Sequence, residues 1–558
     1  MNEQEVDVLI AGGGPFGLML ANELGRRGVT AALFDAKPST AFNPQANATQ
    51  ARTMEHYRRL GFADEIRRLG LPPDYPTDIA YFTRYAGHEL ARFKLPSAKD
   101  AHRTTASNAG SWNAAEPPHR VSQKYVERVL RSHAEALPGI EVRFDWRLTR
   151  FEDEGERVRA WVERNDGSEA REIVARYLVG GDGPRSSVRR GLGITYGGET
   201  GVRRHFFGGR MFAIYLRCPQ FYAVVPHAPA WMNCTFNEDR RAFMAAVDGR
   251  GEFAFHTQLR DGEDEEAITD DDARRMFQTA VGVLVDCEIL SKTGWTAGHA
   301  LVADRFCEGR VIIGGDAAHL FTPAGGLGYN TAIEDAVNLG WKLAAALKGV
   351  AGPALLASYA TERRAVAVRN TRFARAFADS LGNYVPAPEI EDETEAGEVA
   401  RREAGAYLEA HGRREFNIPG ITFGARYDGS PAILSDGATP PEDLVNEYRP
   451  SAVPGGRPPH YWLAPGKSLY DVFGFEWTLL RLGSNPPDAE GFISEAARIG
   501  IDLAVVRISD EAVAALYERP LVLIRPDQIV AWRGADDGDA EAVFARLLGR
   551  DFVVAERA

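Results

Sequence analysis

The sequence predicts an α/β fold that combines a parallel sheet, a second strand-rich region and a C-terminal α/β domain. Three glycine-bearing turns, within residues 11–17, 180–183 and 314–328, each follow an apolar run and precede a helical pattern. Four short segments rich in aromatic and β-branched residues lie between residues 208 and 260. From about residue 458, strand and helix patterns alternate again. These observations favour several α/β units over an all-helical or all-strand chain.

Composition limits the class of protein. The 558 residues are 44% hydrophobic and 26% charged, which is typical of a globular chain of several domains. The net charge of −13 argues against nucleic acid or an anionic membrane as a partner. No apolar run approaches the roughly 20 residues that span a bilayer, so we expect a soluble, cytoplasmic protein. The four cysteines predict neither a disulfide framework nor a metal site, because they are scattered without ligand spacing.

The first glycine turn has the order of a dinucleotide-binding βαβ unit. VDVLIAGGGPFGLMLANELGRRGVTAALFDAK gives a strand, Gly12-x-Gly14-x-x-Gly17, a helix, and a second strand ending at Asp35. Gly12 permits the tight turn, Gly14 lets the backbone approach a pyrophosphate, and Gly17 lets helix and strand pack closely. Asp35 can accept hydrogen bonds from ribose hydroxyls and would repel the 2′-phosphate of NADP. The motif alone leaves FAD and NAD open.

Two later turns complete the pattern. YLVGGDGPRSSVRRGLGI is a strand, a turn at Asp182 and a helix, and GGDAAHLFTPAGGLGYN places Asp316 after another strand. The three segments resemble the GxGxxG, DG and GD motifs of the single-component, FAD-dependent aromatic hydroxylases, the group that includes p-hydroxybenzoate and phenol hydroxylases. The resemblance covers nearly the whole chain. It implies a Rossmann-like FAD-binding domain with an interleaved β-sheet substrate domain and a thioredoxin-like C-terminal domain.

The resemblance assigns the parts of FAD to residues. The ADP half would lie at the first turn, Asp316 would hold a ribityl hydroxyl, and the loop from Gly325 would lie against the isoalloxazine ring, with its N–H groups near the flavin N1/O2 edge. The predicted cofactor-binding residues are Gly12, Gly14, Pro15, Gly17, Asp35, Arg52, Gln123, Asp182, Asp316, Pro323, Gly325, Gly326, Leu327, Gly328 and Asn330.

Two of these assignments, and one further candidate, depend on the resemblance of neighbouring segments. Gln123 matches the family glutamine that faces the flavin chain, and Arg52 begins a segment similar to the family's R-T-(L/M)-E. Asn47 falls where phenol hydroxylase has an aspartate that is proposed to act on the substrate hydroxyl. An asparagine cannot be a base, so Asn47 is expected at most to orient a phenol or a water.

The substrate is expected between the flavin and a sheet formed by the aromatic-rich segments. The candidate pocket residues are Tyr215, Arg217, His227, Trp231, Asn233 and Phe321. By resemblance, the carbonyl of Pro323 faces the reacting edge of the substrate. His319 lies in the GDAAH signature and is expected to pack rather than to catalyse.

The resemblance implies a specific reaction. NAD(P)H would reduce FAD, O2 would form a flavin C4a-hydroperoxide, and the distal oxygen would attack a phenolic ring ortho or para to its hydroxyl. Only one complete fingerprint is present, so NAD(P)H is expected to visit transiently. Two alternatives stay open, namely a related FAD oxidoreductase such as an alkene epoxidase, and a flavin-binding regulator without turnover. The WxWxIP signature of the halogenases is absent.

The predicted domains are interleaved. We assign residues 1–75, 105–185 and 296–345 to the FAD-binding domain, 76–104 and 186–295 to the substrate domain, 346–400 to a helical segment with an acidic linker, and 412–558 to the C-terminal domain. The acidic stretch PAPEIEDETEAGEVARREA is either a linker or a solvated helix, and a mobile connection is preferred. Because all four cysteines precede residue 310, the C-terminal domain is expected to be structural or to form a homodimer.

Overall fold

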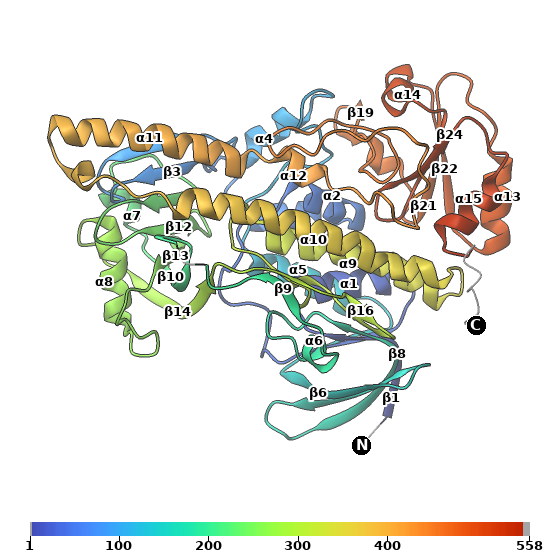
Figure 1. Ribbon diagram of the computed structural model, residues 1–558, viewed down its shortest axis with the longest axis horizontal. Helices are drawn as coiled ribbons and strands as arrows, with labels where there is room; N and C mark the ends of the chain where they lie inside the picture. The colour runs from blue at the N-terminus through green and yellow to red at the C-terminus, as the bar shows by residue number, and fades with distance from the viewer. Residues whose placement is uncertain (1–2, 203, 551–558) are drawn as a thin grey trace.

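The computed structural model describes residues 3–202 and 204–550. Two long helices, α9 and α10, run across the centre of the molecule, with a strand-rich region on one side and the C-terminal domain on the other (Figure 1). Within the described residues, no helix is both long and apolar enough to cross a membrane.

An eight-stranded sheet forms the first unit, with the order β16-β17-β8-β1-β2-β5 and with β7 and β6 added beside β8. The pairs among β17, β8, β1, β2 and β5 are parallel. The strands are β1 (Glu3–Ala11), β2 (Ala31–Asp35), β5 (Ile140–Phe144), β6 (Trp146–Asp153), β7 (Val158–Arg164), β8 (Ala170–Gly180), β16 (Cys307–Glu308) and β17 (Val311–Ile313). The parallel sheet predicted at the N-terminus is thereby confirmed.

Helices cover this sheet because its central strands end in apolar segments, with Val8 to Ala11 of β1 buried. The helix α1 packs against both α5 and α9. The helices of this unit are α1 (Pro15–Gly25), α2 (Ala51–Leu60), α3 (Ala63–Leu69), α4 (Ala98–Thr105), α5 (Gln123–Glu135), α6 (Ser187–Gly191) and α9 (Leu327–Leu347).

The three glycine turns meet at one edge of the sheet. Because β17, β8 and β1 are parallel neighbours, their carboxyl ends lie side by side. The N–H of Gly181 donates a hydrogen bond to the carbonyl of Ala11 at 2.7 Å. The N–H of Gly314 donates one to the carbonyl of Gly180 at 3.1 Å. Ligands of open parallel sheets bind at this edge.

A seven-stranded sheet has the order β14-β10-β13-β12-β11-β3-β4. Its strands are β3 (Ile79–Phe82), β4 (Glu89–Phe93), β10 (Gly209–Arg217), β11 (Met232–Thr235), β12 (Ala242–Ala246), β13 (Glu252–Gln258) and β14 (Glu288–Ala297). Each of the four predicted aromatic-rich segments is one of these strands, so that prediction is confirmed. The helices α7 (Phe221–Val224) and α8 (Asp270–Val281) accompany the sheet, and a small sheet joins β9 (Tyr196–Glu199), β15 (Ala300–Ala303) and β18 (His319–Leu320).

The acidic stretch is a helix, and the expectation of a mobile connection is wrong. After α10 (Pro353–Gly382) and a short turn η2 (Pro388–Glu391), α11 runs over Glu395–Phe416. It packs along β4. Its buried face includes Ala400, Ala404 and Leu408, which recur at helical spacing and contribute to the core of the seven-stranded sheet. The acidic residues of the stretch lie on the opposite face of α11. Their number obscured the apolar stripe in the sequence.

The C-terminal domain has the predicted α/β pattern. Its four-stranded sheet, ordered β22-β21-β23-β24, combines one parallel pair with two antiparallel pairs. The elements are β21 (Trp477–Leu482), α13 (Glu490–Ile499), β22 (Leu503–Ile508), α14 (Glu511–Tyr517), β23 (Leu521–Ile524), β24 (Val530–Gly534) and α15 (Ala540–Leu547). A small hairpin of β19 (Trp462–Ala464) and β20 (Lys467–Ser468), with η3 (Leu469–Val472), precedes this sheet, and α12 (Pro419–Phe423) lies upstream of it.

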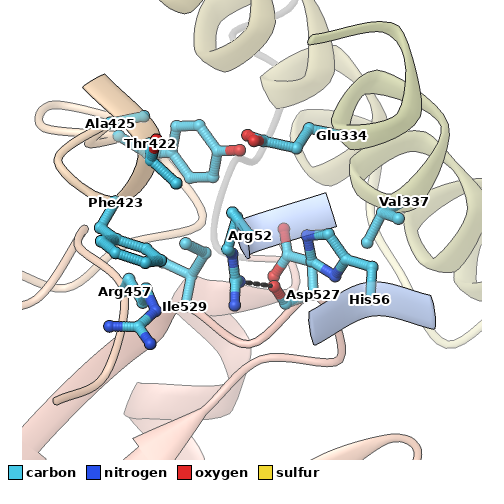
Figure 2. Close-up of a pocket in the computed structure, with 11 residues that line it drawn as sticks. Arg52, His56, Glu334, Val337, Thr422, Phe423, Ala425, Arg457, Asp527 and Ile529 are labelled. Atoms are coloured by element: carbon cyan, nitrogen blue, oxygen red, sulfur yellow. Dashed lines mark hydrogen bonds between the residues drawn. The ribbon is translucent and has the colours of Figure 1, made fainter. Parts of the chain in front are cut away.

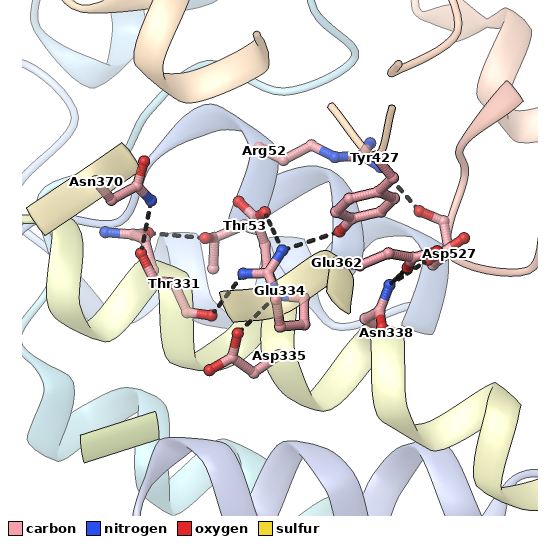
Figure 3. A network of polar contacts seen from close by, with 12 residues as sticks. Arg52, Thr53, Thr331, Glu334, Asp335, Asn338, Glu362, Asn370, Tyr427 and Asp527 are labelled. Atoms are coloured by element: carbon pink, nitrogen blue, oxygen red, sulfur yellow. Dashed lines mark hydrogen bonds and ion pairs between the residues drawn. The ribbon is translucent and has the colours of Figure 1, made fainter. Parts of the chain in front are cut away.

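Buried charges connect the C-terminal domain to α9 and α10 (Figure 3). Glu362 of α10 binds Lys342 of α9 at 2.6 Å and Arg525 of the C-terminal domain at 2.8 Å. Arg525 also binds Asp527 at 2.6 Å, and Asn338 donates to both Glu362 and Asp527. Burial opposes ionisation of Glu362, but the charges of Arg525 and Lys342 outweigh it and hold its pKa well below the usual range. These paired buried charges therefore hold the C-terminal domain against α9 and α10.

Candidate functional site

The first glycine turn connects β1 to α1 with the expected division of roles. Gly12 has a φ of +110°, and a Cβ atom there would overlap the carbonyl oxygen of Gly181. A Cβ at Gly17 would overlap the carbonyl oxygen of Gly12. Around Gly14, in contrast, an added Cβ would meet no protein atom within 4 Å. Gly12 and Gly17 therefore serve close packing, and Gly14 leaves an open surface at the N-terminus of α1, where an anion is favoured.

Asp35 and Pro15 complete this turn. Pro15 occupies the first turn of α1. One carboxylate oxygen of Asp35 accepts the N–H of Gly13 at 2.6 Å, and the other accepts the N–H of Lys37 at 2.7 Å. Each oxygen keeps a second lone pair, so the carboxylate can still accept a ribose hydroxyl.

Asp182 holds the start of α6. Its Oδ2 accepts hydrogen bonds from the N–H and the hydroxyl of Ser187, at 2.7 and 2.8 Å, and from the N–H of Val188 at 3.2 Å. Its Oδ1 is buried and has no partner among the described residues. Asp182 thus shapes the turn that packs against Gly12, and one of its acceptors stays free for a ligand.

Asp316 lies where β17 leaves the same sheet edge. Its side chain is exposed to solvent, although burial of its surroundings raises the pKa of its carboxyl, with His319 and Lys37 acting in the opposite direction. Tyr196 donates to the backbone carbonyl of Asp316 at 2.6 Å and fixes the turn.

The loop from Thr322 to Gly328 leads into α9. Gly325 and Gly326 have φ values of +67° and +63°, which other residues rarely adopt. Because Leu327 and Gly328 are in the first turn of α9, their N–H groups have no partner within the helix. The N–H of Gly325 instead donates to Glu415 of α11 at 2.9 Å. The N–H of Gly325 is therefore occupied by protein, and the predicted contact between the N–H groups at the start of α9 and the flavin stays a prediction.

Asn330 connects the loop to the segment around residue 50 through side-chain hydrogen bonds. Its Oδ1 accepts from the N–H of Gln50 and the hydroxyl of Thr53, and its amide donates to the carbonyls of Ala48 and Gly326. The polar atoms of its side chain are bound to protein, so this side chain positions the loop. The predicted contact of Asn330 with the cofactor stays a prediction.

His319 has the structural role expected of it. The side chain is fully buried, and Nε2 lies 2.7 Å from Oδ2 of Asp335. Asp335 also binds Arg363, at 2.6 Å. The imidazole therefore belongs to the packing under α9 (Figure 3 labels Asp335).

These residues fit FAD. The turn at Gly14 offers an uncovered helix N-terminus to a pyrophosphate, Asp35 and Asp316 offer carboxylates at two neighbouring points of the sheet edge, and the start of α9 offers free N–H groups. A ligand that is long and anionic at its middle matches this series of donors and acceptors.

Gln123 and Asn47 lie on adjacent segments beside this edge. The backbone N–H of Gln123 donates to the carbonyl of Ala46 at 2.7 Å, and its side-chain amide donates to Glu127. The amide of Asn47 donates to Pro44 at 3.2 Å, while its buried Oδ1 has no partner within the described chain. Asn47 can therefore accept one further hydrogen bond.

The side chain of Arg52 points toward the C-terminal domain. Its guanidinium binds Glu55 at 3.0 Å and the backbone carbonyls of Asp527 and Gln528 at 2.9 and 3.0 Å. It lines a small pocket between α2, α9 and the C-terminal domain, together with Arg457 (Figure 2). These partners favour a structural role for Arg52, and its predicted contact with the cofactor stays a prediction. The sequence motif identified a buried arginine but not its partner.

Replacing Arg52 by methionine should weaken the fold and spare the cofactor. Glu55 and the two carbonyls would lose a charged donor, which is expected to lower the free energy of unfolding by about 2–3 kcal/mol. The FAD dissociation constant should stay unchanged. Urea unfolding and flavin fluorescence measure the two quantities, and Arg68→Met on the exposed side of α3 is the control. Loss of FAD affinity at unchanged stability would restore the predicted cofactor role.

The structure does not bring the predicted pocket residues together. Tyr215 binds Lys124 and Glu252 through its hydroxyl, and Arg217 is an exposed partner of Glu252. His227 lies 2.7 Å from the carbonyl of Gly87, at the far hairpin. These three side chains already have protein partners.

Asn233 is on the other face of the seven-stranded sheet from Tyr215. By register, Asn233 lies beside Met244, and Met244 lies beside Phe255. Phe255 packs on Phe277 of α8, on the outer side. Asn233 is therefore removed from the pocket. Strand pattern alone could not assign the face, since a slip of one residue reverses it.

The remaining candidates lie closer to the sheet edge. Phe321 packs on His319 with a centroid distance of 4.8 Å, and Pro323 is exposed two residues before the glycine pair. Trp231 is buried immediately before β11. These three stay candidates for contact with substrate.

The inner face of the seven-stranded sheet carries aromatic residues that the sequence did not single out. His256 stacks on Phe243 with a centroid distance of 4.4 Å and meets Trp295 at 5.8 Å. All three are partly exposed, on the same sheet face as Tyr215. This face contacts α5 through Tyr215 and residue 43 through Ser291. It thus forms an aromatic wall toward the segment around Asn47.

Acid should destabilise the protein through His256. Burial lowers the pKa of His256 to about 4, below the ordinary 6.5, so the unfolded chain takes up a proton first as the pH falls. Its contribution to stability is therefore complete above about pH 6.5 and is lost toward pH 4, at a cost of about 2 kcal/mol between pH 7 and pH 4.5. Urea unfolding of wild type and His256→Phe at both pH values measures the difference. An identical pH dependence in the two proteins would contradict this prediction.

Two protein-family models match this chain, one over its N-terminal part and one over its C-terminal part. The model of the "FAD binding domain" family matches residues 5–374, and that of the "Aromatic-ring hydroxylase, C-terminal" family matches residues 451–551. A putative polyketide hydroxylase from Streptomyces halstedii is 31% identical over 563 residues, covering 96% of this chain and 94% of the relative.

Two solved structures share the whole architecture. The rebeccamycin biosynthetic enzyme RebC with reduced flavin superposes with a TM-score of 0.86 and 34% identity, covering 98% of this chain and 100% of RebC. A ternary complex of aklavinone-11 hydroxylase with FAD and aklavinone gives a TM-score of 0.80 and 28% identity, covering 99% and 100% of the two chains.

Proposed function

Because this chain belongs to the FAD-dependent aromatic-ring hydroxylases, we propose that it hydroxylates a phenolic ring ortho or para to an existing hydroxyl, with NAD(P)H and O2 as co-substrates. FAD is the cofactor. Once bound and reduced, FAD supplies the oxygen-transfer chemistry. The protein must therefore hold the flavin, position the ring and exclude water.

The observation that carries this proposal is the meeting of three separate turns at one sheet edge, in a protein whose second sheet carries an aromatic wall. Gly14, Asp35 and Asp316 supply the points that would hold the ADP half and the ribityl chain of FAD. The wall of Phe243, His256 and Trp295 suits a flat aromatic substrate. No metal or nucleophile is required by this arrangement.

The size of the wall favours a substrate of more than one ring. Three partly exposed aromatic side chains in contact cover more area than a single phenol. The relatives include a putative polyketide hydroxylase and a protein that binds aklavinone. We therefore favour a polycyclic phenol over phenol itself.

Substrate deprotonation is not assigned to a base in this chain. Asn47 has a free, buried acceptor oxygen beside the proposed flavin position and can orient a phenol hydroxyl. His256 stays neutral at physiological pH because its pKa is lowered to about 4, so it can act as an uncharged donor or acceptor in the wall.

A substrate panel tests the proposal. Purified protein should be yellow, and its NAD(P)H oxidation should rise when hydroxynaphthalenes or hydroxyanthraquinones are added, with a product heavier by one oxygen atom. Mass spectrometry with ¹⁸O2 identifies the inserted oxygen. Epoxide products would favour the alkene epoxidase alternative, and FAD binding without NAD(P)H oxidation across the panel would favour the regulator. Light scattering tests the expected homodimer.

A further inference from the structure

Arg120 lies just before α5 with a guanidinium that is not paired. Its side chain is partly buried. The guanidinium carbon of Arg120 lies over the ring of Trp231, 4.0 Å from the ring centroid. Within residues 3–202 and 204–550, no hydrogen bond or ion pair to protein holds the charged group.

Three fully or almost fully buried arginines of this chain have acidic partners. Arg363 binds Asp335, Arg457 binds Glu55, and Arg525 binds Glu362. An unpaired buried charge is costly, since desolvation is not repaid. Burial alone lowers the pKa of Arg120 to about 10, with no acidic group opposing it.

A second unpaired donor lies beside the guanidinium. The indole Nε1–H of Trp231 is buried and has no acceptor among the described residues. The guanidinium carbon lies over the indole ring, and within the described residues its N–H groups have no hydrogen-bond or ion-pair partner. A cation and a neutral donor together form a local site for an anion.

The position of Arg120 connects the two halves of the proposed active site. The bridge between Thr49 and His119 places Arg120 next to Ala48. The Cβ of Ala48 is 3.3 Å from the point that a Cβ of Gly326 would occupy. Trp231 immediately precedes β11 of the seven-stranded sheet. Arg120 therefore lies between the loop proposed for the flavin ring and the sheet proposed for the substrate.

We infer that Arg120, supported by Trp231, binds a carboxylate carried by the aromatic substrate, so that the enzyme selects phenolic acids over neutral phenols. This inference rests on the proposed hydroxylase function. It adds the chemical class of the substituent, which the family matches do not supply.

Matched ligand pairs test the inference on the FAD-loaded protein. The pairs are a hydroxynaphthoic acid and a dihydroxyanthraquinone carboxylic acid, each with its primary carboxamide, and binding is read from the flavin absorbance change. Wild type should bind each acid at least about tenfold more tightly than its amide. Arg120→Gln should lose this preference, while FAD affinity and amide binding stay within about twofold. Arg120→Lys should retain part of the preference, because it keeps the charge but not the bidentate edge.

The control is Arg128→Gln, which removes an exposed arginine on α5 and should leave the preference intact. Equal binding of acids and amides by wild type, or a preference that persists in Arg120→Gln, overturns the inference. Turnover of neutral phenols without binding of the acids also overturns it and leaves the hydroxylase proposal standing. Failure of wild type to bind FAD or to oxidise NAD(P)H with any phenol instead overturns the proposed function.

Discussion

Gly14→Val is expected to give a folded protein that has lost FAD, whereas Gly12→Val is expected not to fold. Gly14 has extended backbone angles that valine adopts readily, and an added Cβ meets no protein atom within 4 Å. The valine would occupy the space through which the pyrophosphate approaches the N-terminus of α1. FAD affinity should fall by about a hundredfold, while the free energy of unfolding of the apoprotein changes by less than about 1 kcal/mol.

Gly12 differs because its neighbours are protein atoms. With a φ of +110° and the carbonyl of Gly181 in the way, any side chain forces β1 and β8 apart. Circular dichroism and urea unfolding of the apoproteins, with FAD titration followed by fluorescence quenching, separate the two effects. Gly14→Val with the affinity of wild type would contradict the placement of FAD at this turn.

Glu362→Gln is expected to destabilise the protein by about 3–5 kcal/mol, because Lys342 and Arg525 would keep their charges in a buried site without their shared counter-ion. The C-terminal domain should then become the first part to be cut by a protease. Urea unfolding and limited proteolysis of the full chain measure the two effects.

A matched variant distinguishes burial from charge alone. Arg498 and Glu495 form an ion pair at 2.6 Å, but the arginine side chain is 60% exposed. Arg498→Met should change stability very little, since exposed pairs contribute little. Comparable losses in Glu362→Gln and Arg498→Met would contradict the role given to the buried network.

The sequence predicted the parts of the fold that depend on local chemistry. Gly12 and Gly17 lie in the predicted turn because a Cβ atom at either position would overlap a backbone carbonyl oxygen. The aromatic-rich segments became strands, and the C-terminal pattern became an α/β domain. In these regions, backbone propensity and burial favour the same structure.

The features that could not be predicted from the sequence depend on contacts between residues that are far apart in the chain. Arg52 matched its motif, but its partners are more than 470 positions away, at Asp527 and Gln528. The faces of β10 and β11 depend on strand register, so Asn233 was predicted on the wrong side and His256 was not identified. Arg120 gave no signal in the sequence, because an unpaired arginine is recognised only when its surroundings are known.

The bond between Glu415 and the N–H of Gly325 has a consequence for how the protein is made. The turn at Gly12 leaves the ribosome early, but the loop before α9 and the helix that anchors it are synthesised hundreds of residues later. The complete flavin pocket therefore cannot exist on a nascent chain that ends before α11. Cofactor loading should follow the synthesis of most of the chain, and truncations upstream of residue 415 should give apoprotein even though the whole GxGxxG unit is present.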